Sequence, residues 1–224
     1  MDQRLRSSSA HVIVTDLAAP VLDERDEHHL RRVLRLRHGE SVTVTDGFGG
    51  WRPCRFGATG LEVDGEVDHV PAPARPVRVA VAPPKGERLE WLIQKVTEIG
   101  VDRITLVRAE RAIVRWDEAK GARQRERLAT IAREAAMQSR RVHLPTLDGP
   151  VAALDVLRTV PAAEPGGRPL TTADDAIAIG PEGGWSPAEL STATLVDLGP
   201  QILRVETAAM VAAALMVHGR DGPR

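Results

Sequence analysis

The sequence predicts an α/β protein with two domains, a small β-rich domain over residues 1–72 and an α/β domain with a parallel sheet flanked by helices over residues 73–224. Three observations lead to this prediction. Short β-branched runs with Asp-Gly turns come first, a proline-rich stretch follows, and apolar runs then alternate with amphipathic helical patterns. A chain of 224 residues can bury a core without disulfides or structural metals.

A hairpin pattern dominates the first domain. Ser41–Thr45 is β-branched, Asp46-Gly47 is a typical hairpin turn, and residues 51–56 are expected to return as the second strand. Pro53 favours an edge or a bulge for that strand. Leu61–Val63, before a second Asp-Gly pair, predicts a further short strand.

One basic helix accompanies these strands. Residues 26–37 carry apolar side chains at helical spacing with arginines between them, and His38-Gly39 is expected to end the helix. The simplest assembly of these elements is a small barrel with one helix. Residues 70–76 are rich in proline and mark the domain boundary.

The second domain opens with a β-α-β pattern. Residues 77–82 form an almost continuous apolar strand, as expected when both faces of a sheet are covered. Residues 87–99 have one apolar stripe that ends at Gly100, and residues 104–107 form the next strand. This order predicts a parallel sheet with a right-handed crossover.

The following segments are less regular. Residues 111–116 are an irregular basic segment, and residues 124–139 form a second amphipathic helix. Prolines and glycines in residues 144–175 leave room for one short helix near 151–157 and one weak strand. Ser186-Pro187-Ala188-Glu189 is a capping box with proline at the first helical position, so a helix starts there.

Two glycine loops near the C-terminus are the strongest functional signal. The apolar run of residues 177–179 meets GPEGG at 180–184, and LGPQILRVETAA at 198–209 leads into an alanine-rich helix. Glycine loops after strands leave backbone N–H and C=O groups free, which suits an adenine edge and a ribose. The alternative is that each loop simply ends a strand.

Several other chemistries lack a matching motif. The chain has no G-x-G-x-x-G, no P-loop, no G-x-S-x-G and no His, Asp or Glu cluster at metal spacing, so we expect no metal. The lone Cys54 excludes a disulfide framework and fits a reducing compartment. No apolar run approaches the roughly 20 residues of a membrane span, so we expect a cytoplasmic protein without membrane contact.

Charge is distributed unevenly along the chain. The formal net charge of -1 argues against nonspecific binding of polyanions. Arginines nevertheless cluster in residues 28–37 and 103–141. These clusters either contact phosphates or are ordinary solvated helix faces.

GPEGGWS and LGPQILRVETAA together resemble the signature of the SPOUT methyltransferase superfamily, and in particular the 16S rRNA uracil-N3 methyltransferase (RsmE) family. Further matches follow in the family's order and cover nearly the whole chain: HHLRRVLRLRHGE, KGERLEWLIQKVTEIGV, AERAIVRW and REAAMQSRR. Residues 144–175 look shorter than usual in the family. The resemblance implies a PUA-like N-terminal domain, a deep trefoil knot in the C-terminal domain, S-adenosylmethionine as cofactor, 16S rRNA within the small ribosomal subunit as partner, and a homodimer.

The resemblance also implies roles for particular residues. The cofactor would be bound by Ile179, Gly180, Pro181, Glu182, Gly183, Gly184, Leu198, Gly199, Ile202, Leu203 and Arg204. Because uracil N3 carries a proton at neutral pH, methylation requires proton removal or stabilisation of the imide anion, for which Arg204, Glu206 and Glu182 are the catalytic candidates. Arg32, Arg35, Arg111, Arg115, Arg140 and Arg141 would bind rRNA phosphates.

Three other functions stay open at this point. The first is another SPOUT RNA methyltransferase, acting on a ribose 2′-oxygen or another base in tRNA or 23S rRNA. The second is a non-catalytic RNA-binding protein, and the third is a small-molecule enzyme that uses the same pocket. Arg204 and Glu206 have a purely structural alternative as an ion pair at a helix N-terminus.

Overall fold

The structure is a computed structural model and describes residues 2–220. These residues form two compact units. The first contains the residues up to Ala72 together with Ala136–Leu144, and the second contains Pro73–Ala135 together with the residues from Pro145 onward. The segment Ala136–Leu144, which the sequence pattern assigned to the second domain, therefore groups with the first unit.

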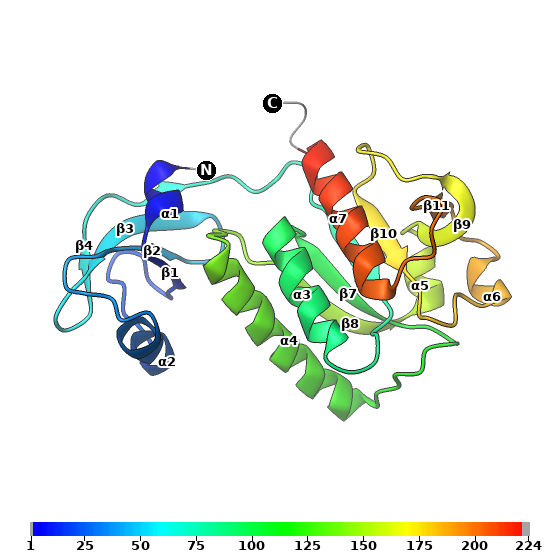
Figure 1. Cartoon of the computed structure of the whole chain (residues 1–224), viewed down its shortest axis with the longest axis horizontal. Coiled ribbons are helices and arrows are strands. Elements are labelled where there is room, and N and C mark those ends of the chain that lie inside the picture. The colour runs from blue at the N-terminus through cyan, green and yellow to red at the C-terminus, as the bar shows by residue number, and fades with distance from the viewer. Residues whose placement is uncertain (1, 221–224) are drawn as a thin grey trace. The chain divides into compact units, whose positions relative to one another are not determined.

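The first unit is built on a five-stranded sheet (Figure 1). Its strands are β1 (Ala10–Ile13), β2 (Ser41–Thr45), β3 (Gly50–Phe56), β4 (Leu61–Val63) and β5 (Asp68–His69). The order is β1-β2-β3-β4, with β5 also paired to β3; β1 and β2 are parallel and the other pairs are antiparallel. The predicted hairpin of β2 and β3 is confirmed, whereas β1, β5 and the short helix α1 (Gln3–Ser7) were not foreseen.

Three details of this unit differ from the sequence prediction. The strand order is that of an open sheet, with no pairing between β1 and β4 to close a barrel. The basic helix is α2 (Glu24–His28) followed by a π-helical turn, η1 (His29–Val33), and it ends before Gly39. Arg35 at φ 55° turns the chain out of the helix, so the break precedes the expected glycine cap.

Pro53 lies in an inner strand rather than at an edge. It faces Thr43 of β2, and β4 and β5 pair with β3 on the other side. The Pro53 carbonyl accepts a hydrogen bond from the backbone N–H of Asp64 at 3.1 Å, just after β4 ends. The backbone nitrogen of Pro53 points to the same side as its carbonyl, toward the gap between β4 and β5. No strand carbonyl in that gap needs a donor, so the N–H that proline lacks is not missed. Cys54 is consequently buried, and burial raises the pKa of its thiol to about 11.

A buried histidine connects β1 to the returning segment of the same unit. His11 Nε2 donates to the Arg141 carbonyl at 3.1 Å, so Nδ1 accepts from the Thr43 hydroxyl at 2.8 Å. Burial lowers the pKa of His11 to about 4, with Arg140 contributing in the same direction and the Arg141 carbonyl opposing it. The folded state therefore holds this imidazole neutral.

We expect this histidine to make the protein less stable in mild acid. Below pH 6.5, its usual pKa, the His11 side chain is protonated in the unfolded chain. In the folded state it stays neutral down to its lowered pKa of about 4. Stability is thus lost as pH falls, by about 2 kcal/mol between pH 7 and pH 5. Urea denaturation of the full chain at both pH values measures this, and a His11→Gln variant that kept the same pH slope would contradict it.

The second unit is built on a six-stranded sheet whose pairs are all parallel. Its order is β11-β9-β10-β6-β7-β8. The bounds are β6 (Arg78–Val81), β7 (Arg103–Arg108), β8 (Thr146–Ala152), β9 (Ala162–Pro169), β10 (Ala176–Ile179) and β11 (Leu195–Asp197). The predicted parallel sheet is confirmed. Residues 144–175 hold two strands, β8 and β9, where the sequence suggested one, because their prolines and glycines hide the β pattern.

Helices cover both faces of this sheet. They are α3 (Arg88–Ile99), α4 (Glu118–Gln138), α5 (Ala153–Leu157), α6 (Pro187–Leu190) and α7 (Val205–Arg220). One core packs α3, α7 and Leu128 of α4 against the sheet, and a second core packs α5 and Trp185 against the other face. Gly100, at φ 114°, ends α3 as predicted, and the Ser186 capping box starts α6.

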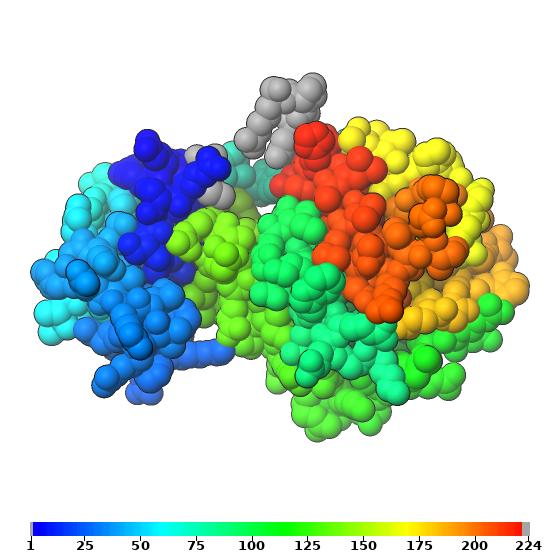
Figure 2. Space-filling model, in the orientation of Figure 1, coloured from blue at the N-terminus to red at the C-terminus, as the bar shows by residue number. Residues whose placement is uncertain are grey.

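Helices α3 and α7 lie side by side and run in the same direction (Figures 1 and 2). Arg88 and Glu206 meet where both helices begin, and Gly100 lies against Val217 where both end. This arrangement brings residues from two distant segments to the same edge of the sheet. The trefoil knot implied by the resemblance depends on how the chain threads rather than on strand order, and it stays a prediction.

No helix within residues 2–220 combines the length and the apolar character that crossing a membrane would require.

Candidate functional site

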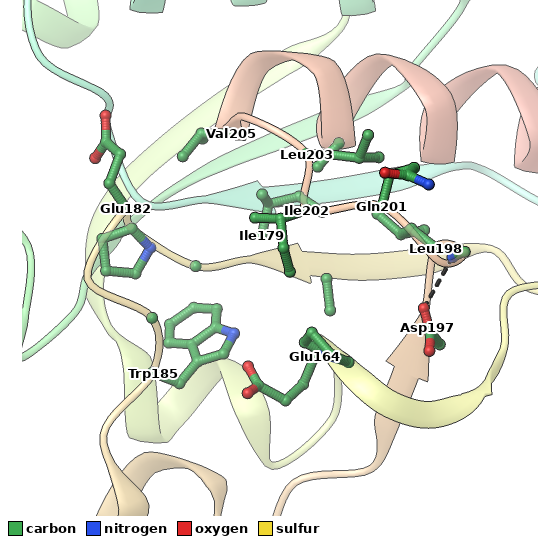
Figure 3. Close-up of a pocket in the computed structure, with 17 residues that line it drawn as sticks. Glu164, Ile179, Glu182, Trp185, Asp197, Leu198, Gln201, Ile202, Leu203 and Val205 are labelled. Atoms are coloured by element: carbon green, nitrogen blue, oxygen red, sulfur yellow. Dashed lines mark hydrogen bonds between the residues drawn. The ribbon is translucent and has the colours of Figure 1, made fainter.

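A pocket of about 240 Å³ lies at the carboxyl ends of β10 and β11 and beside the first half of β9 (Figure 3). Three chain segments and the first turn of α7 form its walls. The lining residues are Ala163, Glu164, Pro165, Ile179, Gly180, Pro181, Glu182, Gly184, Trp185, Asp197, Leu198, Gly199, Gln201, Ile202, Leu203, Val205 and Ala208. The carboxyl edge of a parallel sheet is where α/β proteins usually bind ligands.

The two predicted glycine loops meet in this pocket. Gly184 and Gly199 have φ values of 68° and 114°, and a Cβ at either position would meet no protein atom within 4 Å. The backbone at both glycines therefore faces open space. Gly180 has a different reason to be glycine, because a Cβ there would lie 3.0 Å from the Trp185 ring.

Asp197 holds the second loop against the middle of β9. Its Oδ1 accepts the backbone N–H of Gly199 at 2.8 Å, and its Oδ2 accepts that of Gly166 at 3.1 Å. These hydrogen bonds lower the pKa of the Asp197 carboxyl. The second loop is thus anchored by this side chain, which uses the N–H of Gly199.

Arg88 connects the two carboxylates that the sequence proposed as catalytic. Its Nη2 donates to Glu182 Oε1 at 3.0 Å, and its Nη1 lies 3.9 Å from Glu206 Oε2. Glu206 is only 6% exposed, and its Oε2 has no hydrogen-bond partner. Glu182 is therefore held in an ion pair, while Glu206 presents a buried acceptor that still lacks a donor.

The loop after β7 is fastened to the first glycine loop. Glu189 Oε1 accepts the backbone N–H of Glu110 at 2.8 Å, while its Oε2 accepts that of Ser186 at 2.7 Å. Arg111 Nη1 donates to the Trp185 carbonyl at 3.2 Å and lies 3.5 Å from that of Gly183. The capping glutamate of α6 thus also positions a neighbouring loop.

Most of the residues proposed to bind the cofactor line the pocket. These are Ile179, Gly180, Pro181, Glu182, Gly184, Leu198, Gly199, Ile202 and Leu203. Gly183 and Arg204 do not: Gly183 turns toward Arg111, and Arg204 is exposed just before α7. Glu206 lies in the first turn of α7, next to the lining residue Val205.

Sequence reasoning missed the pocket wall formed by the first half of β9. Glu164 and Pro165 come from the segment whose pattern was hard to interpret, and Arg88 was not singled out. Trp185, Asp197 and Gln201 flank the two loops and could have been found by extending each loop by one or two residues. Nothing local marks Glu164 or Arg88, because the rest of the pocket around Glu164 and the carboxylates beside Arg88 lie far away in the sequence.

The arginines proposed to bind RNA fall into two groups. Arg32 and Arg35 of the first unit are exposed, as are Arg111 and Arg115 of the second. Arg140 is instead half-buried; its guanidinium donates to the carbonyls of Ser8 at 2.7 Å and Met137 at 3.2 Å, and burial lowers its pKa. Arg140 therefore has a structural role within the first unit.

Arg141 is also half-buried, and its carbonyl accepts the His11 hydrogen bond described above. Among residues 2–220 we find no group of three or more His, Cys, Asp and Glu side chains arranged to hold a metal ion.

Comparisons with known proteins agree with this architecture. The model of an RNA methyltransferase domain matches residues 71–217, and that of an RNA methyltransferase PUA domain matches residues 22–63. The expected PUA-like domain at the N-terminus is confirmed. The two matched regions correspond to the β-rich module and the parallel-sheet unit.

Similar proteins carry one name across distant bacteria. The chain is 33% identical to ribosomal RNA small subunit methyltransferase E of Mycobacterium bovis, covering 87% of this chain and 84% of that protein. The Bacillus subtilis protein of that name is 30% identical, with 83% and 84% covered.

Solved structures show the same fold. The Neisseria gonorrhoeae enzyme of that name, bound to S-adenosyl methionine, superposes with a TM-score of 0.79 at 25% identity, covering 92% of this chain and 96% of that one. A probable rRNA methyltransferase from Porphyromonas gingivalis has a TM-score of 0.79 at 26% identity, with 96% and 100% covered. The chain therefore belongs to the family of ribosomal RNA small subunit methyltransferase E, an RNA methyltransferase of the SPOUT type with an N-terminal PUA domain.

Proposed function

We propose that this protein transfers a methyl group from S-adenosylmethionine to N3 of a specific uridine in 16S rRNA. The observation that supports this most directly is the pocket itself. It joins two glycine loops to a buried carboxylate at the start of α7, one oxygen of which has no hydrogen-bond donor, within a chain of the small-subunit rRNA methyltransferase family.

The pocket residues fit the proposed cofactor. Ile179, Leu198 and Leu203 offer apolar surface for an adenine ring. The N–H groups of Gly184 and Gly199 already donate to Pro181 and Asp197, so these glycines offer their carbonyls as acceptors for the adenine edge and a ribose. The bound cofactor supplies an electrophilic methyl group on a positively charged sulfur. The protein's own part is to bind, orient and exclude water.

Glu206 is the residue we propose to take the N3 proton. Its Oε2 is buried and accepts no hydrogen bond from the protein, so it can accept one from an N–H of the substrate. Glu182 is less suited, because Arg88 already occupies its carboxylate at 3.0 Å. The N3 proton would pass to the Glu206 carboxylate as N3 takes the methyl group, whose bond to the cofactor sulfur breaks and leaves a neutral thioether.

Arg204 is proposed to stabilise the negative charge that develops on the uracil oxygens. It is exposed, it precedes Glu206 by two residues, and no side-chain partner engages it within residues 2–220. A guanidinium is suited to two oxygens of a planar anion. Arg32, Arg35, Arg111 and Arg115 are proposed to bind rRNA phosphates, which position the substrate without reading its sequence.

The test is to map methylation directly. Purified protein and radiolabelled S-adenosylmethionine are incubated with 16S rRNA, either free or in small subunits from cells that lack this activity. The rRNA is then digested and its nucleosides are identified by mass spectrometry. We expect 3-methyluridine; 2′-O-methylation would favour another SPOUT reaction, and no product with either substrate would favour an RNA-binding protein without catalysis.

We infer that the protein is a homodimer that buries the outer face of α3 and α7. Trp91 of α3 is 44% exposed, Val211 of α7 is 43% exposed, and the parallel register of the helices puts these side chains at a similar level. Ile202, at the pocket, is 88% exposed. A second copy would cover this apolar face and extend the pocket wall.

Val211→Arg is expected to convert the dimer to a monomer, since it would bury an unpaired charge in the interface. Analytical ultracentrifugation measures the mass. Leu154→Arg is the matched control, because Leu154 is 49% exposed on α5, on the other side of the sheet. Loss of the dimer in the control alone would place the interface elsewhere.

We also propose that the protein acts in the cytoplasm, where 16S rRNA is assembled into subunits. The proposed domain boundary between residues 72 and 73 is supported by the same division of the chain into compact units.

A further inference from the structure

Negative charge accumulates in the pocket wall. Glu164, Glu182 and Asp197 all line the pocket, and no Lys or Arg does so. A concave site with several carboxylates favours a ligand that carries positive charge.

Two of these carboxylates already have partners in the protein. Glu182 pairs with Arg88, and Asp197 accepts two backbone N–H groups. Glu164 differs from both, because no hydrogen bond or ion pair engages its carboxylate within residues 2–220. Glu164 and Asp197 therefore carry the negative charge of the pocket that no cation balances, and of these two only Glu164 is free of hydrogen bonds.

The fold directs Glu164 into the pocket. Its strand, β9, lies between β10 and β11, the two strands that lead into the glycine loops. Figure 3 shows its side chain turned toward the cavity, with the carboxylate pointing toward Trp185. Trp185 is only 3% exposed, so the carboxylate faces a wall that excludes water on one side. Such a wall strengthens an electrostatic interaction with a bound ligand.

We propose that Glu164 is the residue by which the pocket distinguishes the charged sulfonium cofactor from its product. The inference rests on the proposed cofactor site. The methyl donor carries a positive charge on sulfur, whereas S-adenosylhomocysteine has lost the methyl group and has a neutral thioether. A carboxylate near the sulfur therefore favours the donor over the product, which helps the product to leave.

The experiment compares three ligands by isothermal titration calorimetry. They are S-adenosylmethionine, S-adenosylhomocysteine and sinefungin, which carries a protonated amine near the position of the sulfonium group. Glu164→Gln keeps the size and shape of the side chain and removes its charge. Glu118→Gln removes an exposed carboxylate of α4 outside the pocket and is the matched control. Thermal unfolding checks that each variant is folded.

We expect Glu164→Gln to weaken binding of the two charged ligands by about tenfold and that of S-adenosylhomocysteine by less than about twofold. The control should bind all three as the unchanged protein does. Raising the salt concentration should narrow the difference between the unchanged protein and Glu164→Gln for the charged ligands.

Two results would overturn this inference. Equal weakening for all three ligands would mean that Glu164 holds a group common to them, such as the ribose. Unchanged affinity for all three would mean that it does not face the ligand. If the unchanged protein bound none of the three ligands, the proposed cofactor site itself would be contradicted. Failure of the Glu164 inference and failure of the proposed function therefore give different results.

Discussion

Replacing Glu206 with glutamine is expected to slow methyl transfer at least about a hundredfold, with affinity for S-adenosylhomocysteine within about twofold of the unchanged value. The amide keeps the shape of the side chain but is a far weaker proton acceptor. Glu206 does not line the pocket, so the cofactor should bind almost normally. Single-turnover methylation and calorimetry measure the two effects separately.

The same comparison distinguishes a catalytic role from a structural one. If Glu206 serves only as a partner of Arg88, then Glu206→Gln should lower thermal stability and leave the rate nearly unchanged. Arg204→Ala should also slow transfer, since an exposed guanidinium would be lost from the substrate side. Glu118→Gln, on an exposed turn of α4, should change neither rate nor affinity. Normal turnover in both Glu206→Gln and Arg204→Ala would contradict the proposed chemistry.

Gly184→Val is expected to lower affinity for S-adenosylhomocysteine at least about tenfold while the fold is kept. A β-branched residue at φ 68° is strained by about 1–3 kcal/mol, and the loop can relieve this only by moving. The new side chain also projects into open space at the pocket, because no protein atom lies within 4 Å of the Cβ position. Backbone groups and ligand would both be displaced.

Gly39→Val is the matched control for this loop. Gly39 has φ 87°, its Cβ position is equally open, and it belongs to the first unit. Both variants should therefore lose similar stability in thermal unfolding, but only Gly184→Val should lose the ligand in calorimetry. Unchanged affinity of a folded Gly184→Val protein for S-adenosylhomocysteine would contradict the assignment of the first loop to the cofactor.

Elements with strong local signals were predicted correctly from the sequence. The β2–β3 hairpin follows from an Asp-Gly turn between β-branched runs, α3 from one apolar stripe closed by Gly100, and α6 from its capping box. These signals act within a few residues of the chain, so no tertiary information is needed to recognise them. The glycine loops belong to the same class, which is why most of the pocket lining could be named in advance.

The sequence predictions were wrong where contacts with residues distant in the chain decide the structure. Pro53 is tolerated in an inner strand only because β4 and β5 leave a gap beside it. The strands β8 and β9 are stabilised by pairing with neighbouring strands of the sheet, although their own sequence is rich in proline and glycine. Arg140 looked like an exposed cation in a basic run, yet the carbonyl of Ser8 engages its guanidinium.

The sequence by itself determined the two-domain α/β organisation, the family and the two loops that form the pocket, because each depends on local pattern and residue identity. Only the tertiary structure decided which carboxylates already have a hydrogen-bond partner in the protein. Arg88 donates a hydrogen bond to Glu182 across 94 positions of the chain, whereas Glu164 and Oε2 of Glu206 accept no hydrogen bond within residues 2–220. The chemistry of a carboxylate depends on the groups within a few ångströms of it, and folding brings those groups from distant parts of the chain.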